Sequence, residues 1–83
     1  MSERLPVVSG KELIKWMASM GYKVVRQKGS HIRLERNSPL GMHAITVPFH
    51  KEIAKGTLNN IIDSIAQAAN RNKVELISQL ARF

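Results

Sequence analysis

Residues 22–36 read YKVVRQKGSHIRLER, and this stretch decides the fold. Its first part, Tyr22 to Gln27, is rich in residues that favour strands. Its last part, Ile32 to Arg36, alternates apolar with charged side chains, as a half-buried strand does. Lys28-Gly29-Ser30 between them has the composition of a tight turn. The stretch therefore predicts a β-hairpin, and alternation places His31 on the charged face of its second strand.

A helical pattern precedes the hairpin. Ser9 and Glu12 have capping-box spacing, and Gly21 is a suitable C-terminal stop, so a helix is expected from Gly10 to Met20. Its apolar residues recur with helical spacing at Leu13, Trp16, Met17 and Met20. Because Trp16 belongs to this stripe, we expect its side chain in the core.

A third strand and two further helices are expected after the hairpin. Met42 to Val47 is the strand, Asn37 to Gly41 is the loop before it, and Pro48 ends it because proline cannot donate to the ladder. Thr57 is expected to cap the next helix, whose apolar face carries Leu58, Ile61, Ile62, Ile65, Ala66 and Ala69. After Asn70-Arg71-Asn72, a short third helix is indicated by Val74, Leu76, Ile77 and Leu80.

Together these elements predict an α+β fold of order α-β-β-β-α with an added C-terminal helix. Short connections favour an antiparallel three-stranded sheet, with the helices packed on one face. The opposite face is then available for contact. The 83 residues are expected to form a single domain, 1–83, with a core over about residues 9–69 and an extension over 70–83.

Composition indicates the cellular compartment and the class of binding partner. The chain has no cysteine, no apolar run long enough for a membrane helix, and no apolar signal-peptide core in residues 1–10, so a cytoplasmic protein is expected. A net charge of +7 predicts attraction to polyanions, either nucleic acid or an acidic protein. With only 5% aromatic residues, a single-strand binder built on base stacking is disfavoured.

His31 is the first candidate for chemistry, because imidazole exchanges protons near neutral pH. RNA carries its own nucleophile, the 2′-hydroxyl. Cleavage then needs a base, and cations to balance charge on phosphorus, and it needs no cofactor or metal. Arg26, Lys28 and Arg33 lie close to His31 in the sequence and are expected to hold a phosphate.

The other polar candidates are weaker. His50 follows the third strand and is read as a second proton carrier, a phosphate contact or an exposed loop residue. His43 shares a face with the apolar residues of its strand, so a structural role is expected. The spacing of the three histidines, without cysteine, predicts no metal site. Gly56-Thr57 is read as a helix cap rather than an anion site, and no acidic residue completes a triad with Ser30.

The ordered motifs resemble the HicA toxin family over about residues 9–69. They are GKELIK at 10–15 with GY at 21–22, KGSH at 28–31, ITVP at 45–48, His50, GTL at 56–58 and II at 61–62. The resemblance implies a fold similar to double-stranded RNA-binding domains, cleavage of mRNA, and neutralisation by a HicB antitoxin. It places the family's catalytic histidine on His31 and includes Gly29 and Ser30 in the RNA-binding turn.

Two features depart from the family's pattern. Ile32 stands where many members carry a second histidine or another polar residue, and Lys73 to Phe83 is additional. The extension is expected to cover the core, pair two chains or contact the antitoxin. The leading hypothesis is a metal-independent endoribonuclease toxin that acts on mRNA. The alternatives are a non-catalytic RNA-binding module and a protein-interaction module of the same fold.

Overall fold

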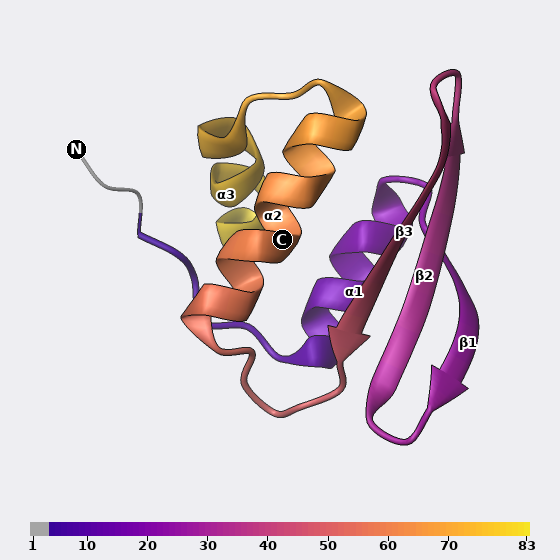
Figure 1. The fold of residues 1–83 in the computed structure, drawn as a ribbon. Coiled ribbons are helices and arrows are strands. Elements are labelled where there is room, and N and C mark those ends of the chain that lie inside the picture. Colours follow the sequence, from indigo (N-terminus) through magenta and orange to yellow (C-terminus); the bar gives the residue numbers. More distant parts are fainter. Residues whose placement is uncertain (1–3) are drawn as a thin grey trace.

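The computed structural model describes residues 4–83, and its elements confirm the predicted α+β order. They are α1 (Gly10–Ser19), β1 (Lys23–Lys28), β2 (His31–Ser38), β3 (Gly41–Pro48), α2 (Lys55–Ala69) and α3 (Lys73–Arg82). The strands form one antiparallel sheet in the order β1-β2-β3. The helices lie on one side of this sheet, and no described element covers its other face (Figure 1).

The ends of α1 agree with the sequence. The backbone N–H of Ser9 donates to Glu12 Oε1 at 2.8 Å, and the N–H of Glu12 donates to Ser9 Oγ at 3.0 Å. This capping box lowers the pKa of Glu12, chiefly through the hydrogen bond from the Ser9 backbone. After Ser19 the helix is capped by Met20, and Gly21 follows with a φ of +98°, a conformation that favours glycine.

Two local predictions are wrong. Thr57 does not cap α2, because the helix begins at Lys55 with Ala54 as its cap and no side-chain capping hydrogen bond. Its start is set instead by burial of Ile53, whose N–H donates to the Val8 carbonyl at 2.8 Å. The loop expected over residues 37–41 is much shorter, because β2 and β3 extend into it from both sides.

The β2–β3 connection is a two-residue turn at Pro39 and Leu40, since Ser38 and Gly41 are already paired across the hairpin. Ser38 Oγ accepts a hydrogen bond from the Leu40 N–H at 3.3 Å and donates one to the Gly41 carbonyl at 2.8 Å. Gly41 has a φ of +118°. A polar side chain and a glycine therefore close a tight turn that composition alone reads as a loop.

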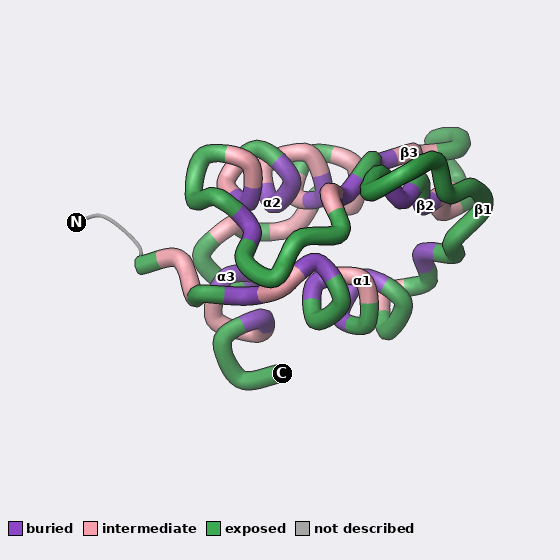
Figure 2. Tube along the Cα trace, turned by 90° about the horizontal axis from the view of Figure 1, so that it is seen from below, coloured by how far each residue is buried: buried purple, intermediate pink, exposed green. Residues whose placement is uncertain are grey.

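A single hydrophobic cluster joins the sheet to all three helices. Trp16 is buried, as expected, and so are Leu34 on β2 and Ile62 on α2. Three residues of α3, Leu76, Ile77 and Leu80, belong to the same cluster. The extension over residues 70–83 thus completes the core. The buried segments of the helices and of β2 and β3 face one another, whereas β1 is exposed along its length (Figure 2).

The first turn of α1 packs against the chain just after β3. The Gly10 N–H donates to the His50 carbonyl at 2.8 Å. A Cβ on Gly10 would lie 2.5 Å from the Pro48 carbonyl oxygen and 2.9 Å from the Phe49 Cα, which is closer than such atoms approach. Glycine is therefore required here by close backbone contact. Within residues 4–83, none of the helices has the length and apolarity needed to cross a membrane.

The close backbone contact at Gly10 gives a testable prediction, for which Gly56 provides the control. Gly10→Ala should lower the free energy of unfolding by about 1–3 kcal/mol, because the added methyl group meets backbone that cannot yield. Gly56, in the first turn of α2, has no atom within 4 Å of the position that an added methyl group would take. Gly56→Ala should therefore leave stability unchanged or raise it by up to about 1 kcal/mol. Urea unfolding followed by circular dichroism measures both, and equal responses of the two variants would contradict the close contact.

Candidate functional site

A β-bulge in β1 decides which side chains reach the open face of the sheet. Val24 lies opposite Leu34, which is buried under the helices. The next paired residue is Arg26, opposite Arg33, so Val25 is an extra residue in the strand. Strict alternation from Val24 would turn Arg26 toward the helices. The extra residue shifts the alternation by one and brings Arg26 to the open face.

The open face consequently carries two neighbouring rows of side chains. In the first row, His31 on β2 lies between Lys28 on β1 and Pro48 on β3. In the second row, two residues further along β2, Arg33 lies between Arg26 and Thr46. Directly opposed side chains have their Cβ atoms about 4.5–5.5 Å apart, and two residues along a strand span about 6.8 Å. Histidine and three cations therefore share one small surface.

Arg26 and Arg33 form a pair of like charges directly across the hairpin. Such a pair destabilises a sheet, because the two guanidinium groups repel each other. Both residues are exposed, so water and salt screen part of this repulsion. A bound anion between the two groups would remove the rest. The arrangement therefore costs stability in the free protein and favours a ligand with negative charge.

Glu35 holds the Arg33 side chain on this surface. Arg33 Nε lies 3.1 Å from Glu35 Oε2, and both side chains are partly exposed, at 44% and 32%. An ion pair this exposed adds little to stability. It engages the Nε of Arg33 and leaves the two terminal nitrogens of the guanidinium for an anion. Glu35 thus orients the guanidinium of Arg33 on the open face.

The turn before His31 is tied to the segment after β3. Gly29 has a φ of +58°, and the Ser30 carbonyl accepts a hydrogen bond from the Phe49 N–H at 2.6 Å. This bond brings His50 to the same end of the sheet as His31, and both residues are exposed. The predicted residues Lys28, Gly29, Ser30, Arg26 and Arg33 lie on the hairpin beside His31. The structure thus gathers the predicted set around one end of the sheet, with His50 at its margin.

His43 has the structural position that the sequence predicts. Its Nδ1 lies 2.7 Å from the Tyr22 hydroxyl, and its Nε2 lies 2.9 Å from Ser64 Oγ on α2. A neutral imidazole satisfies both contacts, because one ring nitrogen accepts and the other donates. Burial and the nearby Arg36 charge lower the pKa of His43. Burial also raises the pKa of Tyr22. The chain of three side chains joins the α1–β1 connection to β3 and α2.

Three features of the site are not predicted by the sequence analysis. They are the bulge at Val25, the Arg33–Glu35 ion pair, and Thr46, whose exposed hydroxyl lies beside Arg33. Thr46 could have been found, because it alternates with the apolar residues Ile45 and Val47 and so faces away from the core. The adjacent valines Val24 and Val25 interrupt the period of two and are the only trace of the bulge in the sequence.

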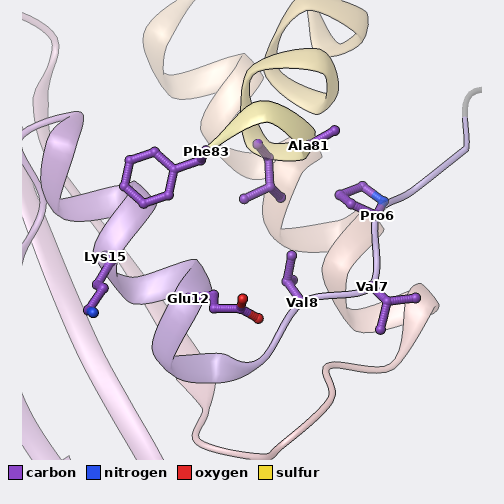
Figure 3. Close-up of a pocket in the computed structure, with 8 residues that line it drawn as sticks. Pro6, Val7, Val8, Glu12, Lys15, Ala81 and Phe83 are labelled. Carbon is purple, nitrogen blue, oxygen red and sulfur yellow. The ribbon is translucent and has the colours of Figure 1, made fainter.

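The predicted residues lie on an open surface, away from the cleft on the helical side of the molecule. A cleft of about 300 Å³ opens on the helical side, between the segment before α1, α1 itself and the end of α3 (Figure 3). Its walls include Val8, Glu12 and Phe83, and no candidate residue lines it. Within residues 4–83, no group of three His, Asp or Glu side chains is placed to hold a metal ion. An open, cationic face suits an extended polyanion better than a small enclosed ligand.

Comparison with known proteins identifies one family. The family model of the HicA toxin of bacterial toxin–antitoxin systems matches residues 10–69. This segment begins at the start of α1, ends at the end of α2, and includes both rows of the open face. A search of curated proteins and a search of solved structures found no match.

The partly buried His43 predicts how the free energy of unfolding depends on pH. Because folding lowers the pKa of His43 below its ordinary value of 6.5, the unfolded chain binds more protons than the folded chain at mildly acidic pH. The contribution of neutral His43 to the free energy of unfolding is fully present above pH 6.5. It is lost as the pH falls through the lowered pKa of His43. The free energy of unfolding, measured in urea at intervals between pH 7.5 and 5, should therefore decline, and His43→Gln should decline less.

Tyr22→Phe is the control for this measurement. It removes the hydroxyl group that contacts His43 and keeps the imidazole in its partly buried position, so the variant should be less stable but should keep the decline with pH. A wild-type decline that persists undiminished in His43→Gln would show that other groups cause it.

Proposed function

From the premise that this chain belongs to the HicA toxin family of bacterial toxin–antitoxin systems, we propose that it is a cytoplasmic, metal-independent endoribonuclease that cleaves mRNA. A HicB-type antitoxin inhibits it. The observation that carries the proposal is the arrangement of the open face, where His31 lies opposite Lys28 and next to the opposed pair Arg26 and Arg33. A proton carrier and three cations on an exposed face meet the needs of RNA cleavage.

His31 is the proposed general base. It takes the proton of a ribose 2′-hydroxyl, whose oxygen then forms a bond to the adjacent phosphorus. The bond from phosphorus to the 5′-oxygen of the next nucleotide breaks, and that oxygen takes up a proton. The products are a 2′,3′-cyclic phosphate and a 5′-hydroxyl. His50 is at the same end of the sheet as His31 and is the candidate for the proton donor or for a phosphate contact.

The cations bind the substrate and stabilise the reacting phosphate. Lys28 lies directly opposite His31 and is proposed to balance the charge that develops on the phosphate oxygens. Arg33 and Arg26, one row away, are proposed to hold a neighbouring phosphate. The backbone of Gly29 and Ser30 shapes the turn that presents His31. General acid–base catalysis contributes about 10²–10⁴-fold, so positioning and charge supply the remaining acceleration.

The first experiment replaces the proposed base. His31→Ala should reduce cleavage of a labelled single-stranded RNA, in the presence of a chelator, by about 10²–10⁴-fold. Growth inhibition should be lost as well. Because His31 is exposed, the melting temperature and circular dichroism spectrum of the variant should match those of the wild type. Arg82→Ala, an exposed change at the end of α3, is the control and should cleave normally.

The outcomes of that assay separate the alternatives. Cleavage undiminished in His31→Ala refutes the assignment of the base. RNA that is bound but left uncut by the wild type indicates a non-catalytic RNA-binding module. A wild type without RNA affinity near physiological salt, which still binds its antitoxin, indicates a protein-interaction module.

A second experiment concerns the opposed arginines. In a His31→Ala background, Arg26→Gln should weaken binding of single-stranded RNA and reduce the slope of log affinity against log salt by about 0.7. The same substitution removes the repulsion by Arg33, so the free energy of unfolding should rise by about 0.2–1 kcal/mol. Fluorescence anisotropy and urea unfolding measure the two effects.

Arg82→Gln is the matched control for Arg26→Gln, since it removes an exposed arginine from the helical side of the molecule. It should leave the salt slope unchanged. Equal slopes for Arg26→Gln and Arg82→Gln would show that the RNA does not contact the paired arginines.

A further inference from the structure

β1 is an edge strand with an unusual composition. It pairs with β2 on one side, and no described strand pairs with its other side. All six of its residues are exposed. Three of them, Lys23, Arg26 and Lys28, are cations, and none is an acid. An edge strand presents backbone N–H and C=O groups that are free to bond another strand.

Two exposed valines lie on this same strand, one toward each face of the sheet. Val24 is 54% exposed although its partner Leu34 is fully buried, because the helices do not extend over β1. Val25 is 49% exposed and lines a hollow of about 290 Å³ on the open face, together with Lys23 and Glu35. β1 lies at the outer edge of the sheet in both views (Figures 1 and 2). The strand thus offers apolar contacts as well as charge.

We infer that the edge of β1 takes an added β-strand from the antitoxin, and that this strand is acidic. The inference rests on the antitoxin partner of the proposed function and does not depend on RNA cleavage. Carboxylates on alternate residues of the added strand would face Lys23, Arg26 and Lys28, and the residues between them would pack on Val24.

Charge decides among the possible occupants of the edge. A second copy of this chain would set the three cations of one β1 against three of another, which disfavours pairing between copies. RNA is drawn to the cations of the open face but has no backbone amides to continue a ladder. An extended acidic polypeptide satisfies both the free backbone groups and the cations.

Strand addition at this edge also explains how a partner would inhibit the toxin. Lys28 lies opposite His31, and Arg26 lies opposite Arg33. A strand beside β1 would hold its carboxylates next to Lys28 and Arg26, where they compete with phosphate. The partner would therefore neutralise the RNA surface without having to enter a pocket.

The test uses the full chain, without RNA, and a capped eight-residue peptide of alternating Glu and Val as the probe. The peptide should bind in a fluorescence anisotropy assay, and it should slow hydrogen exchange of the β1 amides but not of the α3 amides. A second peptide with the same side chains, N-methylated at alternate residues, cannot complete a ladder and should bind at least tenfold more weakly. Because no RNA is present, failure of the nuclease proposal leaves this result unaffected.

Two substitutions locate the contact. Lys23→Ala should weaken peptide binding by about two- to fivefold, the effect expected of one cross-strand pair. Val24→Thr should also weaken it, whereas Val74→Thr, at a valine on α3 that is 50% exposed, should have no effect. Lys23 and Val24 are outside the proposed RNA-binding set, so both variants should retain wild-type cleavage.

Three results would overturn the inference. They are equal affinity of the N-methylated and unmodified peptides, unchanged exchange of the β1 amides when the peptide is bound, and equal effects of Val24→Thr and Val74→Thr. The first result would show that charge alone causes the peptide to bind. Either of the other two would show that the peptide contacts a surface other than the edge of β1.

Discussion

The structure depends on burial of one face of β2. Ile32 and Leu34 are covered by the helices, and they are 4% and 0% exposed. Full burial of two such side chains is favourable by several kcal/mol, so the orientation of the strand is strongly determined. Because successive residues of a strand face opposite ways, His31 and Arg33 must then lie on the open face. The core therefore places the candidate base and Arg33 where a large ligand can reach them.

The rest of the site is obtained at some cost in stability. The bulge at Val25 interrupts the β1–β2 ladder, and it brings Arg26 to lie opposite Arg33, where like charges repel. Gly10 is needed where α1 contacts the segment that carries His50. Each of these features weakens or restricts the free protein. The first two set the charge of the open face, and the third fixes the segment that carries His50.

The sequence predicts the fold well, because period and burial agree in most elements. Alternation in β2 and the helical stripe through Trp16 identify elements whose apolar side chains are buried in the structure. The wrong predictions concern residues whose local sequence pattern is compatible with two structures. Thr57 has the chemistry of a cap, but burial of Ile53 starts α2 earlier. The bulge at Val25 depends on pairing with β2, which no single-strand pattern contains.

The same distinction applies to the site. His31, Lys28 and Arg33 follow from local sequence, since they lie within six residues of one another in a hairpin. The opposition of Arg26 to Arg33 and the approach of His50 through the Ser30–Phe49 bond are properties of the assembled sheet. These long-range contacts concentrate positive charge at one end of the open face and at the adjoining edge of β1. An RNA substrate and an acidic antitoxin would therefore compete for the same cations, and a single surface would provide both the activity of the toxin and its control.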